Sequence, residues 1–265
     1  PPAPRSAPSS TRRRRPPPDG RISTTGGFDV VLGILEAARW FPLSLACFAL
    51  DQVRLAVVDG TGPLRQDRAV PPGTIAAREI ELLRRILYAF ASDGHIALTR
   101  PEAEVLDAID AAVAGAEPNA EWVDLFVKAM ANVALSASGH AIASRELALA
   151  RSAAIADGDG PLSAAALRSV LIAVGYGGVT AAYVPLSSEE RALVRLERQR
   201  VEIITGEPIP GGEAEWLADR LHRGTTATFA TVALVDLLSR DRHRLSPALA
   251  AALPADVGSR SVAAA

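Results

Sequence analysis

The sequence contains very little cysteine, methionine, lysine and aromatic side chain. Its 265 residues include one cysteine, one methionine and 5% aromatic residues, and Lys128 is the only lysine. A single cysteine cannot pair within the chain, which excludes a disulfide scaffold. The four histidines lack the spacing of a zinc site, and no nucleophile elbow, phosphate loop or dinucleotide fingerprint occurs. The sequence therefore predicts a non-enzymatic protein without a cofactor.

Long apolar runs are also missing. The longest uncharged run, residues 169–188, is interrupted by Gly175, Gly177, Gly178 and Pro185. A membrane-spanning helix needs about 20 mostly apolar residues, so this run is not expected to cross a bilayer. A secretory signal is not recognisable either, because charges and Pro42 break the first apolar stretch. We expect a soluble cytoplasmic protein.

Alanine is abundant, and the order of the apolar residues has the periodicity of helices. Apolar residues make up 49% of the chain, and 51 residues are alanine. Apolar side chains recur every three or four residues in most segments, which favours helices. Thr99, Pro101 and Glu102 form the signature of a capping box before one such segment. The fold class predicted is all-α, a multi-helix bundle, with helices near residues 28–39, 42–58, 80–90, 100–113, 121–133, 141–155, 163–174, 187–201, 212–223, 226–240 and 246–252.

One buried cluster is expected to hold this bundle together. Its predicted members share the apolar faces of the three helices between residues 80 and 133. They are Leu83, Ile86, Leu87, Phe90, Leu106, Ile109, Trp122, Leu125 and Phe126.

The charge is placed unevenly along the chain. Residues 1–18 contain five arginines and no acid, which leaves 23 basic against 30 acidic residues in the remainder. This Pro- and Arg-rich segment carries no large apolar side chain, so we expect a disordered tail. Its run Arg12, Arg13, Arg14 and Arg15 is a possible docking site for nucleic acid or an acidic partner. Beyond the tail we expect an N-terminal helical pair over 19–58, a linker or flexible loop over 59–73, and a main helical domain over 74–265.

A short pattern recurs before three of the expected helices. The pattern is Asp-Gly, one variable residue and then Ile or Leu, and it begins at Asp19, Asp93 and Asp159, with starts 74 and 66 residues apart. Arg223-Gly224 occupies a corresponding place 64 residues further on. A period of this length indicates degenerate helix-turn-helix repeats.

Residues 80–109 and, more faintly, 213–249 resemble the TerB-like family of bacterial helical domains, which is associated with tellurite and other stress responses. The resemblance covers about a quarter of the chain and rests on helical pairs separated by Asp-Gly. It implies a compact all-helical fold, and some members carry acidic metal-binding residues. The helix–Asp-Gly–helix pattern also resembles an EF-hand.

Two groups of carboxylates are candidate metal ligands. An EF-hand loop needs oxygen ligands at positions 1, 3, 5 and 12 around a glycine. Asp93 is the only ligand in its loop, and Asp157 and Asp159 fill two positions of another, so specific calcium binding is not expected. The second group is the row Glu102, Glu104, Asp107 and Asp110, whose spacing allows carboxylates to meet on a helix face. Acids in a first helical turn also favour the helix dipole, which is a structural alternative.

Together these features favour a non-enzymatic helical scaffold or protein-interaction module, for which the resemblance implies an association with stress. Two alternatives stay open. One is a module that binds a divalent metal through Asp93, Glu102, Asp107, Asp110, Asp157 and Asp159. The other is association with nucleic acid through the arginine-rich tail, with a salt-dependent affinity.

Overall fold

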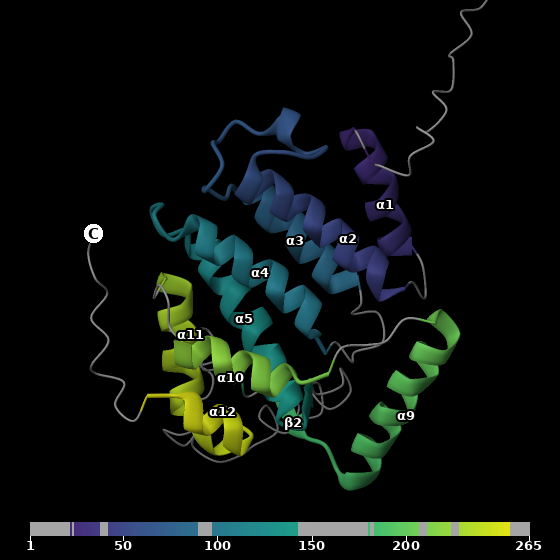
Figure 1. The fold of residues 1–265 in the computed structure, drawn as a ribbon, viewed down its shortest axis with the longest axis vertical. Coiled ribbons are helices and arrows are strands. Elements are labelled where there is room, and N and C mark those ends of the chain that lie inside the picture. Colours follow the sequence, from purple (N-terminus) through teal and green to yellow (C-terminus); the bar gives the residue numbers. More distant parts are fainter. Residues whose placement is uncertain are drawn as a thin grey trace, which may run out of the picture.

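The computed structural model describes residues 22, 24–37, 42–89, 97–142, 180, 183–206, 211–223 and 228–254. These residues form nine α-helices and one two-stranded sheet, which confirms the prediction of an all-α multi-helix fold (Figure 1). The helices are α1 (Thr25–Ala37), α2 (Leu43–Arg54), α3 (Ala77–Ala89), α4 (Arg100–Val113), α5 (Ala120–Ala137), α9 (Ser188–Thr205), α10 (Glu213–Arg223), α11 (Phe229–Arg240) and α12 (Pro247–Ala252).

Helix α5 lies at the centre of the bundle. It packs against α3 and α4 on one side and against α10 and α11 on the other, and α1 and α2 extend the first group (Figure 1). Most of its residues are buried, including Trp122 and Phe126, whose ring centroids lie 5.8 Å apart. One hydrophobic core runs from Phe28 in α1 to Leu253 after α12. The predicted cluster is therefore confirmed, except that Phe90 lies outside the described residues.

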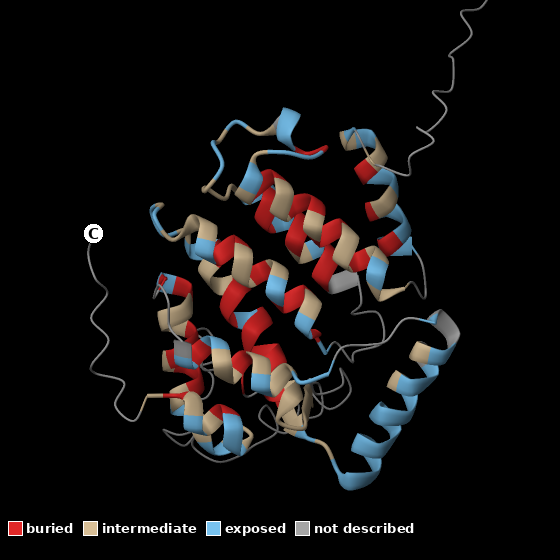
Figure 2. Cartoon of the chain, viewed as in Figure 1, coloured by how far each residue is buried: buried red, intermediate tan, exposed pale blue. Residues whose placement is uncertain are grey.

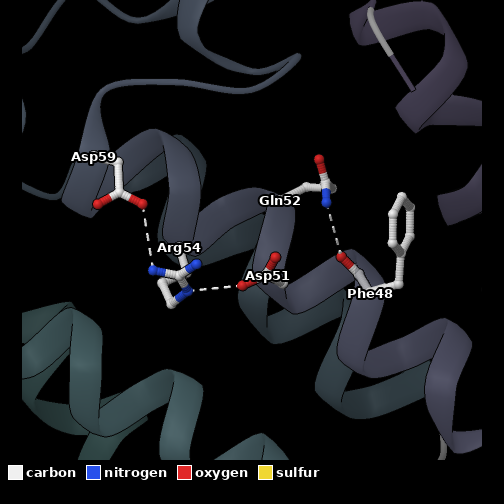
Figure 3. Close-up of polar contacts among 5 residues, drawn as sticks. All are labelled: Phe48, Asp51, Gln52, Arg54 and Asp59. Carbon is white, nitrogen blue, oxygen red and sulfur yellow. Dashed lines mark hydrogen bonds and ion pairs between the residues drawn. The ribbon is translucent and has the colours of Figure 1, made fainter. Parts of the chain in front are cut away.

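The segment 59–73 packs onto the bundle. Leu64 belongs to the core, and the Gly73 amide donates to the Val57 carbonyl at 2.9 Å. Before this segment, α2 continues into a π-helical turn (Leu55–Asp59). Arg54 bridges the junction, donating to Asp51 at 2.7 Å and to Asp59 at 3.3 Å (Figure 3). The chain reverses at Gly60, whose positive φ of 62° favours glycine.

A buried ion pair fixes the same segment to the start of α3. Arg68 and Glu79 approach to 3.8 Å, and each side chain is 4% exposed. Glu79 also accepts a hydrogen bond from the Ala76 amide at 2.9 Å, and Arg68 donates to the Thr74 carbonyl at 2.8 Å. The periodicity of residues 80–90 places Glu79 beside or opposite the apolar face, and its burial was not predicted. Glu79 can be buried because Arg68, which lies in the loop eleven positions earlier, compensates its charge.

The sheet is a short antiparallel pair. Strand β1 (His140–Ile142) pairs with β2 (Tyr183–Pro185), with Ala141 opposite Val184. The predicted helix over 141–155 is therefore wrong at its beginning. The reason is Gly139, which follows α5 with a positive φ of 82° and turns the chain out of the helix.

Most of the predicted helices that fall on described residues are present. Helix α9 continues to Thr205, four residues beyond the predicted end, and stops at Gly206 in the left-handed region. The predicted tail, the three Asp-Gly turns and the predicted helix over 163–174 lie outside the described residues. Within the described helices, none has both the length and the apolar character needed to cross a membrane.

Candidate functional site

The carboxylates of α4 point to separate partners. Glu102 caps its own helix, and Glu104 accepts a hydrogen bond from Arg100 at 2.7 Å. Asp107 forms an ion pair with Arg220 of α10. The structure therefore does not assemble the predicted row into one site. Within the described ranges, no group of three or more histidine, cysteine, aspartate or glutamate side chains is placed to hold a metal.

Glu102 forms the predicted capping box at the start of α4. Its Oε2 accepts hydrogen bonds from the Thr99 amide at 2.7 Å and from the Thr99 hydroxyl at 2.9 Å. The residue is 2% exposed, and this burial raises the pKa of Glu102 to about 7 against the opposing effect of the Thr99 hydrogen bonds. A carboxyl that holds its proton near neutral pH is a poor ligand for a hard cation.

Asp110 joins three helices through its carboxylate. Its Oδ1 accepts from the Trp122 indole N–H at 3.0 Å, and its Oδ2 accepts from the Thr228 hydroxyl at 2.5 Å and the Thr231 hydroxyl at 3.2 Å. Trp122 belongs to α5, while Thr228 is the N-cap of α11. Burial raises the pKa of Asp110, and these hydrogen bonds lower it. The carboxylate therefore locks α4, α5 and α11 together.

A cavity of about 350 Å³ opens beside Asp110. It lies between the end of α4, the N-terminus of α5 and the N-terminus of α11, with Phe229 and Pro118 in its wall. Both helix N-termini are already capped by side chains: Asn119 accepts from the Glu121 and Trp122 amides, and Thr228 accepts from the Thr231 amide. Three polar residues of its lining, Asp110, Asn119 and Thr228, thus already have hydrogen-bond partners.

The remaining candidates fall elsewhere. Asp93, Asp157 and Asp159 lie outside the described residues, as do Arg12, Arg13, Arg14 and Arg15. Their roles as metal ligands or as a docking site for nucleic acid stay predictions.

Among the described residues, several large apolar side chains are exposed. Apart from two on α1 and Phe229, all of them belong to helix α9. Figure 2 shows it almost entirely pale blue and apart from the rest of the bundle. Among its described side chains, only those of Arg198 and Glu202 are partly buried. The exposed apolar side chains are 48–82% accessible across α1, α9 and Phe229, and Ile203 has the highest value. We define the α9 surface as the exposed residues Leu193, Val194, Leu196, Glu197, Arg200 and Ile203.

Contacts at its N-terminus and near its middle hold α9 in place. At its N-terminus, Ser187 and Glu190 form a capping box, and the Leu186 amide donates to the Gly139 carbonyl at 2.8 Å. Strand β2 just before it is secured by Tyr183, which accepts a hydrogen bond from Asn132 of α5 at 2.8 Å. Near the middle of the helix, Arg198 forms an ion pair with Glu213 of α10 at 3.2 Å.

Sequence reasoning predicted α9 as a helix but missed its exposure. The signal in the sequence is that charges interrupt the apolar side, with Glu197 and Arg200 between Leu196 and Ile203. A helix that packs on a protein core has a continuous apolar stripe instead. No family model, curated protein or solved structure matches the chain significantly.

Proposed function

We propose that the chain is a non-enzymatic helical module that binds another protein chain through the α9 surface. The observation that carries this proposal is the exposure of Leu193, Leu196 and Ile203, which are 63%, 60% and 82% accessible on a single helix. Most helical stability in proteins comes from packing of an amphipathic face. A helix that leaves these side chains in water gains that packing when a partner covers them.

The charges of α9 favour a protein partner over a nucleic acid or a lipid surface. The helix contains four arginines and four glutamates, so its net charge is zero. Binding to phosphates or to anionic lipids requires an excess of basic residues. Mixed charges around apolar residues are typical of helices that pair with other helices.

The anchoring of α9 supports the same function. The Ser187 capping box caps its N-terminus, and the Arg198–Glu213 ion pair ties its middle to α10. A binding element that is already folded loses less conformational entropy on association than a flexible one. The bundle behind it thus acts as the scaffold that presents α9.

The stress association, the TerB-like relationship and the association with nucleic acid are separate proposals that do not rest on the α9 surface. The stress association and the TerB-like relationship rest on the resemblance of residues 80–109 and 213–249. Association of nucleic acid with Arg12–Arg15 predicts an affinity that falls steeply with salt and disappears when residues 1–18 are deleted.

Site-specific photo-cross-linking tests the proposed function. A photoreactive amino acid replaces Leu193 in the full chain, and in a matched control it replaces Arg195, which is also exposed but lies about 200° around the helix. We expect intermolecular products from position 193 only, with the cross-linked peptide identified by mass spectrometry. Equal yields from both positions, or products confined to one chain, would contradict the proposal.

A further inference from the structure

The sequence of α9 is self-complementary when it is read in opposite directions from its middle. Outside the central Arg198 and Gln199, residues at equal distances from their peptide bond match in kind over five consecutive steps. Beyond this central pair the matches are Glu197 with Arg200, Leu196 with Val201, Arg195 with Glu202, Val194 with Ile203, and Leu193 with Ile204. In these five pairs apolar residues correspond to apolar residues, and each charge corresponds to an opposite charge.

We infer that the partner of the α9 surface is α9 of a second copy of this chain, paired antiparallel about a two-fold axis at the Arg198–Gln199 bond. This inference rests on the proposed function, because it names the chain that covers the same surface. A two-fold interface uses one patch on both subunits, so that patch must complement itself. The pattern of α9 meets this condition in the antiparallel direction.

Four of the matched residues lie on one side of the helix, whereas the matched pair Arg195 and Glu202 lies on the opposite side. With 100° of rotation per residue, Leu193, Glu197, Arg200 and Ile204 fall within about 60° of arc. Their spacing of four, three and four residues is that of the seam of a coiled coil. In the antiparallel pair, Leu193 lies at the level of Ile204 of the second copy, and Glu197 lies at the level of Arg200. Val194, Leu196 and Ile203 flank this seam.

The charges distinguish the two possible directions. An antiparallel pair brings Glu197 of each copy beside Arg200 of the other, so that two ion pairs form at the centre. A parallel pair in register brings Glu197 beside Glu197 and Arg200 beside Arg200, which is repulsive. In the single chain, Glu197 and Arg200 already face each other at 3.8 Å, with side chains 67% and 70% exposed. Pairing places these four charges in one network flanked by apolar side chains.

A charge-exchange experiment on the full chain tests this arrangement. Sedimentation velocity over a wide range of concentrations measures self-association of the unmodified chain and of three variants, Glu197→Arg, Arg200→Glu and the double exchange. Each single exchange places two like-charged contacts at the centre of the pair, so we expect the dimer dissociation constant to rise at least about a hundredfold. The double exchange restores opposite charges, and we expect it to recover dimerisation. All of these positions are exposed, so the fold should persist, which circular dichroism checks.

The matched control is Arg195→Glu. It makes the same charge change as Arg200→Glu in the same helix, but on the side away from the seam, and it should leave the dimer unchanged. Loss of dimerisation in both arginine variants would assign the effect to net charge and overturn the inference. A dimer that is insensitive to both single exchanges would place the interface elsewhere and overturn it as well.

Hydroxyl-radical footprinting of the α9 side chains separates failure of this inference from failure of the proposed function. A monomer in which Leu193 and Ile203 are readily oxidised would overturn self-pairing but leave the surface open to a different protein. A monomer in which these side chains are protected would mean that another segment of the same chain covers the helix, which would overturn both. A dimer in which they become protected only on association supports both.

Discussion

Replacing Glu102 with glutamine should change how stability depends on pH. The residue is 2% exposed and caps α4 through two hydrogen bonds from Thr99, of 2.7 and 2.9 Å. Glutamine retains a carbonyl oxygen that can accept both bonds and is also accepted in capping boxes. The substitution therefore removes the ionisable group while preserving the cap.

The sign of the effect follows from the raised pKa of Glu102. Its value is about 7 in the folded chain, and the ordinary value of 4.5 applies when the chain is unfolded. Between these values the folded chain binds more protons, so stability falls as pH rises. The contribution of Glu102 is fully present below pH 4.5 and is lost as pH rises through 7. The difference between the folded and unfolded pKa values of Glu102 corresponds to about 3 kcal/mol in the free energy of unfolding, because one pKa unit is worth about 1.4 kcal/mol.

Urea unfolding of both proteins across this pH range measures the effect. We expect nearly equal free energies of unfolding near pH 4.5 and a glutamine variant that is more stable by about 3 kcal/mol above pH 8. Asp107, Asp110 and His140 titrate in both proteins, so their contributions cancel in the difference. A difference that stays constant with pH would refute the assignment of a buried, protonated Glu102.

Three further predictions concern the core, the Asp110 network and metal binding. Phe126→Ala removes a fully buried ring and should cost about 3–5 kcal/mol in urea unfolding, and a cost well below 1 kcal/mol would contradict its place in the core. Asp110→Ala leaves the Trp122 N–H and the Thr228 hydroxyl without their acceptor, and it should cost about 2–4 kcal/mol, against less than about 0.5 for the exposed Asp124→Ala. Calcium or magnesium should leave the melting temperature unchanged, whereas a rise abolished by Asp159→Asn would make metal binding the leading function.

The helices could be predicted from the sequence because the patterns that indicate them are local. Apolar residues spaced for a helix identified the buried sides of α3, α4 and α5, and Thr99 with Glu102 marked the start of α4. These features need only neighbours within one or two turns. The helices predicted from the sequence accordingly agree with the structure where the apolar side of the amphipathic pattern packs on the core.

What the sequence did not reveal depends on contacts between distant segments. Asp110 was placed among possible metal ligands, but its hydrogen-bond donors include Thr228, 118 positions later. Strand β1 pairs with a segment 43 residues further along, and its three residues carry no alternating pattern of their own. The row of acids on α4 separates for the same reason, since Asp107 pairs with Arg220 of α10.

Distances between spin labels on paired chains test the central claim most directly. A single cysteine is introduced at Glu189 or at Gln199 in a full chain that carries Cys47→Ser, and electron–electron distances are measured under conditions where the chain associates. Antiparallel pairing about the Arg198–Gln199 bond predicts labels nearly level with each other at position 199. At position 189 it predicts an additional separation of about 28 Å along the helix axes, from the rise of 1.5 Å per residue. Short distances at both positions, or the absence of a defined distance at either, would contradict the account.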